Sequence, residues 1–346
     1  MAGRFGWWRG AMGVVAAGCA LPALAAPTLY LGSYGGSTQE LFQKKIIPAF
    51  EATHDVKIVY VPGNSTDTLA KLQAQKSKQE LDVVLLDDGP MYQATQFGFC
   101  DKLQDAPVYK DLYDIGRMNA NATSVGVVAT GLVYNTDAFK KAGLPKPDSW
   151  EALTDKRLRQ KIAIPPINNT YGLQTLLTYA RLRHGSDHDI DPGMQALAKE
   201  VGPNVVAWEP SPGKMTEMFQ NGDVTLAVWG SGRVAALKAT GFPVEFVYPK
   251  EGAPAMFTAA CPVVQSDVAA QSQQFIQFLL SPQVQAWLAE GQGWGPVNKN
   301  TRLTPQVAAT VPYTPDQINR LVKTDWTFVN EKRSDWTNRW NRTVER

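Results

Sequence analysis

Histidine is scarce in this chain, which has only three histidines in 346 residues. The sequence also has no Gly-x-Ser-x-Gly, Walker-type or His-Glu-x-x-His motif, the patterns of common hydrolases, nucleotide-binding proteins and zinc proteases. His184 and His188 have the i, i+4 spacing of a helical metal site, but Gly185-Ser186-Asp187 between them favours a polar loop. We therefore expect no enzyme, no metal site and no cofactor; an exported two-lobed enzyme, such as a transferase, is the weaker alternative.

Basic runs and long apolar runs are missing as well. The chain has 34 basic and 32 acidic residues, so its formal charge is only +2. Loss of an N-terminal segment carrying Arg4 and Arg9 would bring that charge to zero. A neutral chain without a basic cluster is a poor ligand for nucleic acid. Its length favours about two domains.

The N-terminus has the three parts of an export signal. Arg4 and Arg9 form a basic region, residues 11–21 are apolar but too short to span a membrane, and Ala23-Leu24-Ala25 fits a cleavage site. We predict a signal peptide over 1–25 and a periplasmic mature protein beginning near Ala26. Two alternatives stay open: lipidation at Cys19, in a partial lipoprotein box, and an uncleaved membrane anchor.

Only two cysteines remain after such processing, Cys100 and Cys261. An even pair in an oxidising compartment favours a disulfide between them. The alternative is two unrelated buried thiols. A disulfide would place two segments that are far apart in the sequence in the same lobe.

Strand-like and helix-like segments alternate along the whole chain, which predicts an α/β fold with parallel strands. In such sheets, ligands bind beyond the carboxyl ends of the strands. The turns at 33–38, 62–67 and 87–92 all follow predicted strands of the first unit. A second α/β unit begins near Val125, and the chain is expected to cross between units near 123–127, 255–261 and 300–305.

Several short segments together resemble one protein family. They are Tyr34-Gly35-Gly36-Ser37, Leu132-Val133-Tyr134-Asn135-Thr136-Asp137, and residues 47–51, 81–84, 147–150, 249–252, 278–283 and 295–298. Their order resembles the periplasmic solute-binding proteins of ABC importers, of the polyamine (spermidine/putrescine) type. The resemblance implies a type II periplasmic binding fold, with two α/β lobes and a ligand cleft at the hinge. It implies lobe 1 over 26–125 plus 260–303, and lobe 2 over 126–259 plus 304–346. Ferric-ion binders of this superfamily use adjacent tyrosines, and this chain has no Tyr-Tyr pair.

The predicted ligand-binding residues follow the strand ends of both lobes. They are Tyr34, Ser37, Ser65, Asp88, Tyr92, Asn169, Tyr171, Trp229, Arg233 and Phe257. Four of them, at positions 34, 65, 229 and 257, also match ligand-facing positions of the polyamine binders. Other interpretations stay open: Trp229 as hinge packing, Asp88 as a helix cap, and Arg233 paired with an acid of its own lobe. Asp67 is better explained as a first-turn helix charge.

The predicted ligand is a small charged nitrogenous solute, either a polyamine or an ω-amino acid. Residues 168–171 lack the carboxylates that polyamine binders place there, and Arg233 would repel a polycation. The alternative is therefore an organic anion or amino-phosphonate held by Arg233. The expected partners are this ligand and an inner-membrane ABC permease, with the protein itself a monomer. A sensory role with a signalling partner is compatible with the same fold.

Overall fold

The structure, a computed structural model, describes residues 1–3, 6, 26–319 and 321–345. The residues that carry the signal-peptide prediction (Arg4, Arg9, 11–21 and 23–25) and Cys19 lie outside the described residues. In the described part of the chain, no helix combines the length and the apolar character that crossing a bilayer requires.

The described strands pair edge to edge in the order β2-β1-β3-β9-β4-β7-β5-β6, and β8 joins at β4. Their bounds are β1 Thr28–Ser33, β2 Lys57–Pro62, β3 Val83–Asp87, β4 Thr123–Asn135, β5 Ile162–Ile164, β6 Val205–Trp208, β7 Leu226–Gly230, β8 Val244–Val247 and β9 Ala255–Pro262. The pairs β1–β2, β1–β3, β5–β6 and β5–β7 are parallel, whereas β4 and β9 run antiparallel to their neighbours. The sheet is therefore mixed, with parallel strands at both ends.

The α-helices alternate with these strands. Their bounds are α1 Ser37–Leu41, α2 Ile47–Glu51, α3 Ser65–Ala74, α4 Asp88–Gln96, α5 Thr136–Lys141, α6 Thr170–Leu182, α7 Asp191–Ala196, α8 Pro212–Asn221, α9 Ser231–Ala239, α10 Ala269–Leu279, α11 Pro282–Gln292, α12 Pro305–Ala308, α13 Pro315–Asn319 and α14 Trp326–Thr343. π-Helical turns are η1 Phe42–Ile46 and η6 Leu197–Val201, and 3₁₀ turns are η2 Pro107–Asp111, η3 Asp114–Gly116, η4 Trp150–Thr154, η5 Lys156–Leu158 and η7 Gly202–Asn204. Because η1 joins α1 to α2, the chain is helical from Ser37 to Glu51.

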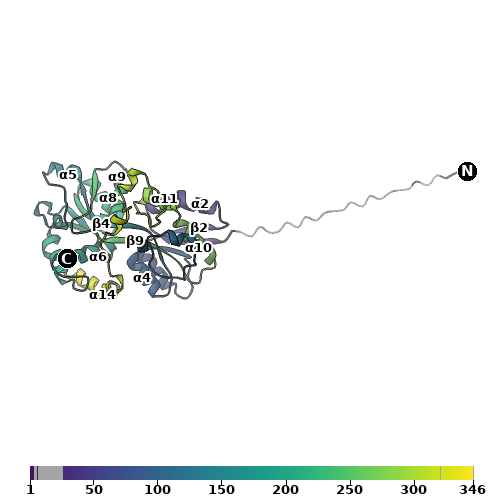
Figure 1. The fold of residues 1–346 in the computed structure, drawn as a ribbon, viewed down its shortest axis with the longest axis horizontal. Helices are drawn as coiled ribbons and strands as arrows, with labels where there is room; N and C mark the ends of the chain where they lie inside the picture. The colour runs from purple at the N-terminus through teal and green to yellow at the C-terminus, as the bar shows by residue number, and fades with distance from the viewer. Residues whose placement is uncertain (4–5, 7–25, 320, 346) are drawn as a thin grey trace.

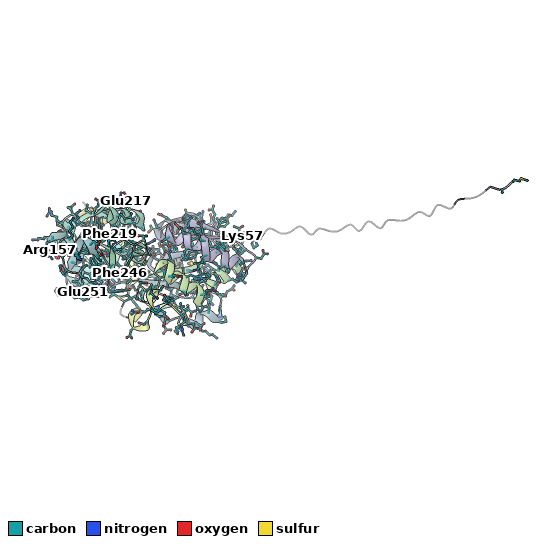
Figure 2. The ribbon with its side chains drawn as sticks, turned by 90° about the horizontal axis from the view of Figure 1, so that it is seen from above. Lys57, Arg157, Glu217, Phe219, Phe246 and Glu251 are labelled. Carbon is teal, nitrogen blue, oxygen red and sulfur yellow. A yellow bond between two sulfur atoms is a disulfide. The ribbon has the colours of Figure 1, made fainter. Side chains whose placement is uncertain are left out.

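The molecule has two halves along its long axis, joined at β4 and β9 (Figure 1). Lys57 on β2 lies at one end and Arg157 at the other (Figure 2). In the first half, β1 and β3 pack with α10 and α11 around a core that includes Phe42, Phe50 and Phe275. In the second half, β5 and β7 pack with α6 and α7 around a core that includes Trp150 and Tyr179.

β4 belongs to both halves. Its residues 123–129 pair with β9, and residues 130–135 pair with β7 and β8. The change of partner falls between Ala129 and Thr130, close to the predicted first crossing. Together with β9, this strand forms the connection that we call the hinge strands.

The C-terminal helix α14 packs on the second half. Its buried residues Trp326, Val329, Trp336 and Trp340 lie on one stripe and join the core of that half. The start of α14 also contacts α4 of the first half. The ring of Trp326 lies so close to Gly89 that a Cβ on Gly89 would be 2.6 Å from it. This helix therefore touches both sides of the hinge.

The predicted disulfide is present in the structure. Cys100 and Cys261 are bonded, with 5.6 Å between their Cα atoms. Cys261 lies in β9 beside Val84 of β3, and Cys100 forms a bridge to Val263 directly after β9. The bond thus ties the segment after α4 to a hinge strand.

Candidate functional site

The two halves enclose a cavity of about 110 Å³ on one face of the hinge strands, which we call the front cavity. Residues from both halves line it: Tyr34, Ser37, Thr38, Asn64, Ser65, Asp87, Val128, Asn169, Tyr171, Pro210, Pro212, Gly232, Arg233, Met256, Thr258, Gln292 and Trp294. These described lining residues include no histidine and no cysteine.

The first turns of five helices converge on the front cavity. α1 and α3 come from the first half, and α6, α8 and α9 come from the second. The first N–H groups of a helix have no intrahelical acceptor, and the helix dipole is positive at that end. α1 and α9 follow Gly36 and Gly230, and neither helix has a side-chain cap. The convergence makes the cavity electropositive and leaves backbone N–H donors for a ligand.

Arg233 adds a full positive charge in the first turn of α9. Its side chain is half-buried, and among the residues that the structure describes no carboxylate lies within ion-pair distance of it. Burial raises the pKa of Tyr171 far above its usual value, and the nearby Arg233 guanidinium works against that rise. Arg233 likewise opposes the rise of the Tyr60 pKa, which burial brings to about 12. A half-buried guanidinium without a counter-ion is a site for an anion.

Asp87 is the only carboxylate that lines the front cavity among the described residues. The Tyr34 hydroxyl donates to its Oδ1 at 2.7 Å, and the Thr170 hydroxyl donates to its Oδ2 at 2.9 Å. Its backbone N–H donates to the Ser65 hydroxyl at 2.9 Å. Because Thr170 starts α6 in the second half, Asp87 connects the two halves across the cavity.

Three aromatic side chains line the cavity. The Tyr34 and Trp294 rings meet edge to face, with centroids 6.1 Å apart. Tyr171 packs against the cores of both halves. Burial, followed by the charge of Asp87, raises the pKa of Tyr34 far above its usual value, so its hydroxyl stays a donor. These rings offer apolar faces to the organic part of a solute.

A second contact between the halves lies beside Arg233. Within the first half, the Thr38 hydroxyl donates to the side-chain carbonyl of Gln292 at 2.7 Å. The backbone of Gln292 in turn faces Gly232, where a Cβ would be 2.1 Å from the Gln292 carbonyl oxygen. α9 can approach the end of α11 this closely because Gly232 has no side chain.

Six of the ten predicted ligand-binding residues line the front cavity: Tyr34, Ser37, Ser65, Asn169, Tyr171 and Arg233. The other four lie elsewhere. Trp229 is 3% exposed and packs in a core cluster of the second half, in agreement with the packing interpretation. Asp88, Tyr92 and Phe257 come together in another cavity, of about 230 Å³, on the opposite face of the hinge strands. We call this the rear cavity.

Strand geometry explains the split. Successive side chains of a strand point to opposite faces. In β9, Met256 and Thr258 line the front cavity, whereas Ala255 and Phe257 line the rear cavity.

Other cavity residues were not among the ten predicted ligand-binding residues. Thr38, Asn64 and Asp87 lie in the turns at 33–38, 62–67 and 87–92 that were expected at the ligand edge, whereas Met256, Thr258, Gln292 and Trp294 lie outside them. The alternation along β9 could have indicated Met256 and Thr258. No local signal marks Gln292 or Trp294, which come from the distant α11 and the segment after it. Asp67, in the first turn of α3, is exposed and its carboxylate accepts from the Asn64 side chain, as a first-turn charge would.

In the described part of the chain, no three histidine, cysteine, aspartate or glutamate side chains lie together so that they could hold a metal ion. The lining of the front cavity offers hydrogen-bonding groups, the charges of Arg233 and Asp87, and apolar ring faces.

Comparison with known proteins agrees with this geometry. Residues 45–315 match the family model described as bacterial extracellular solute-binding protein. The chain is 23% identical over 321 residues to a gamma-aminobutyric acid-binding protein of Pseudomonas aeruginosa, covering 89% of this chain and 88% of that protein. It is 27% identical over 201 residues to the putrescine-binding periplasmic protein PotF of Escherichia coli, covering 54% and 53%.

Among solved structures, the periplasmic binding protein AfuA of Actinobacillus pleuropneumoniae, with fructose-6-phosphate bound, has a TM-score of 0.77. It is 21% identical, and the match covers 92% of this chain and 99% of AfuA. This likeness shows the two-lobed α/β fold that the sequence predicted.

Proposed function

This chain belongs to the family of bacterial extracellular solute-binding proteins, and we propose that it binds a small organic solute through an anionic group in the front cavity. Proteins of this family serve ABC transporters as the substrate-binding component. The single observation that carries the choice of an anion is Arg233, half-buried and without a counter-ion among the described residues, beside the uncapped start of α9.

The remaining features of the cavity support the same solute class. The first turns of five helices, from both halves, add positive potential around the guanidinium. A carboxylate or phosphate would accept charge-assisted hydrogen bonds from Arg233 and from the free N–H groups. Because α1 and α9 belong to different halves, one anion can contact both and stabilise the closed arrangement.

A polyamine fits this cavity less well. Its two or more ammonium groups would meet Arg233 and the helix N-termini, and only Asp87 offers a carboxylate among the described lining residues. That carboxylate already accepts two hydroxyl hydrogen bonds. Putrescine binding by the relative PotF therefore does not carry over readily to this chain.

A zwitterionic ω-amino acid is the second candidate. Asp87 lies beside the rings of Tyr34 and Tyr171. The charges of Arg233 and Asp87 both reach the Tyr171 hydroxyl, where Arg233 lowers the pKa and Asp87 raises it. An acceptor for an ammonium group and a donor for a carboxylate therefore both lie near this ring. The relative that binds gamma-aminobutyric acid favours the same class.

The expected cellular role follows from the family. We infer that the protein works in the periplasm as a monomer and that the closed, loaded form delivers its solute to an inner-membrane permease. The hinge strands and the hydrogen bond between Thr170 and Asp87 provide the connections that such closure needs.

Thermal unfolding of ligand-stripped protein tests the proposal. The panel contains gamma-aminobutyric acid, succinate, fructose-6-phosphate and putrescine. A bound solute at a hundred times its dissociation constant stabilises the protein by about 2.7 kcal/mol. We expect only members that carry a carboxylate or phosphate group to stabilise the protein, and Arg233→Ala to abolish the stabilisation. Arg159→Ala, at an exposed arginine of the second half, is the matched control. Stabilisation by putrescine that survives Arg233→Ala would contradict the proposal.

A further inference from the structure

The rear cavity lies behind the hinge strands and has no part in the proposed solute site. It is larger than the front cavity, at about 230 Å³ against about 110 Å³. The first half contributes α4 to its wall, and the second half contributes the segment leading into α14. Phe257 of β9 forms the side that backs onto the front cavity.

The wall of the rear cavity combines aromatic rings with a buried acid. Tyr92, Phe257 and Trp326 supply the rings, and Asp88 supplies the carboxyl group. Asp88 is 4% exposed, Trp326 3% and Phe257 9%, so this part of the wall is shielded from solvent. Aromatic faces and a carboxylate at one place are the groups that recognise an organic ammonium ion.

We propose that the rear cavity is a second binding site, which takes the ammonium group of a small organic amine between these rings and the Asp88 carboxylate. This goes beyond the proposed solute site, which is built for an anion on the other face of the same strands. The sequence analysis placed residues 88, 92 and 257 in the same ligand site as the front-cavity residues, whereas the structure gathers them here.

Asp88 lacks an internal counter-ion. Among the described residues no cation lies within ion-pair distance of it. Its Oδ1 accepts the Gly89 N–H at 3.1 Å, and the backbone N–H of Phe257 also lowers its pKa. The Trp326 side chain lowers the pKa of this carboxyl group, but its indole N–H has no hydrogen-bond partner within bonding distance in the described structure. A buried carboxylate without a cation is costly, and a bound ammonium group would remove that cost.

Other charged and titratable groups around Asp88 do not fill this role. They are Asp87 on β3, Tyr92 on α4, Arg333 on α14 and, at the rim of the cavity, Asp114, Arg117 and Lys323. Arg117 donates to the Tyr109 carbonyl at 2.8 Å, and Lys323 is exposed. Arg333 donates to the Asn168 carbonyl at 3.0 Å. Arg333 thus acts on Asp88 through its charge but forms no ion pair with it, and Asp88 is the carboxyl group at the deep end of the cavity.

The charge state of Asp88 gives the site a pH signature. Burial has the largest effect on the pKa of Asp88 and raises it. The Trp326 side chain lowers this pKa, the charge of Asp87 raises it, and the result is a pKa of about 8. Near neutral pH most of the carboxyl groups are protonated, so an ammonium ion must displace a proton to bind. Affinity should rise about tenfold between pH 7 and pH 9, since an alkylammonium keeps its charge up to a pKa of about 10.4.

Fluorine NMR of the full protein labelled with 5-fluorotryptophan tests the site directly. The Trp326 resonance is assigned by its loss in Trp326→Phe, and n-butylammonium chloride is the probe. We expect this resonance to shift and saturate as the probe is added. The dissociation constant from that titration should be about tenfold lower at pH 9 than at pH 7. Asp88→Asn should abolish the shift, because asparagine keeps the shape but not the charge. Phe257→Leu should weaken binding by about threefold to thirtyfold.

Two controls separate ammonium recognition from other effects. n-Butanol has the same chain without the charge, and Arg233→Ala disables only the front cavity, so it should leave the n-butylammonium titration unchanged. The proposal is overturned if the Trp326 resonance does not saturate, if n-butanol reproduces the shift, or if Asp88→Asn titrates like the original protein.

Discussion

Asp88→Asn should make the protein more stable in alkaline solution, although it removes a buried, hydrogen-bonded carboxylate. Burial raises the pKa of Asp88 from 3.8 to about 8. The folded state therefore binds more protons than the unfolded state between these pH values, and the stability of the original protein falls as the pH rises through that window. The asparagine variant has no such loss, since its side chain is neutral at every pH.

The magnitude follows from the same two values. Each tenfold change in the acid constant is worth about 1.4 kcal/mol, so the advantage of the variant should grow by about 4 kcal/mol between pH 5 and pH 9. At pH 5 the two proteins should differ by less than about 2 kcal/mol, because Asp88 is protonated when folded.

Urea unfolding of both proteins, followed by far-UV circular dichroism at pH 5, 7 and 9 without added amine, measures this difference. Effects of other titrating groups cancel when the two proteins are compared at the same pH. A stability difference that stays constant over this range, or one that favours the original protein at pH 9, would show that Asp88 is charged in the folded state and would refute the reasoning.

Three further predictions concern the connections around the hinge. Thr170→Val removes the hydroxyl that donates to Asp87 across the front cavity. The lost hydrogen bond to a charged group is worth about 1.5–3 kcal/mol, so solute affinity measured by calorimetry should fall at least tenfold. An unchanged affinity would mean that this bond plays no part in closure. Gly232→Ala places a Cβ 2.1 Å from the Gln292 carbonyl oxygen, so α9 and α11 should separate and the radius of gyration of the loaded protein should rise in X-ray scattering. Gly213→Ala, whose Cβ would meet only Ser211 Oγ at an ordinary contact distance of 3.8 Å, should change nothing. The double variant Cys100→Ser, Cys261→Ser opens a cross-link between residues 161 positions apart; it should lower the free energy of unfolding by about 2–5 kcal/mol in urea titrations, and a loss below 1 kcal/mol would contradict the assigned role.

Much of the fold was readable from local patterns. The alternation of strand-like and helix-like segments predicted the α/β fold, and the turns at 33–38, 62–67 and 87–92 follow β1, β2 and β3 as expected. The disulfide between Cys100 and Cys261 followed from cysteine number and compartment, and the structure contains it. β8 was missed because its four residues at the sheet edge give too short a pattern.

The site was harder to predict, because side-chain direction decides it. Asp87 and Asp88 are neighbours, yet one lines the front cavity and the other the rear. Phe257 and Trp229 were placed on the correct strands but on the wrong face for the front cavity. The register of a strand against its neighbours decides which face of the sheet each side chain points to. The sequence of that strand alone does not reveal the register. Residues such as Gln292 reach the cavity through tertiary packing alone.

A crystal structure of the protein with its naturally retained solute tests the central claim most directly. The account predicts a carboxylate or phosphate of that solute within hydrogen-bond distance of the Arg233 guanidinium and of the first N–H groups of α9. An ammonium group in contact with Asp87 is compatible with it. A solute that carries no anionic group, or one whose anionic group lies away from Arg233, would contradict it.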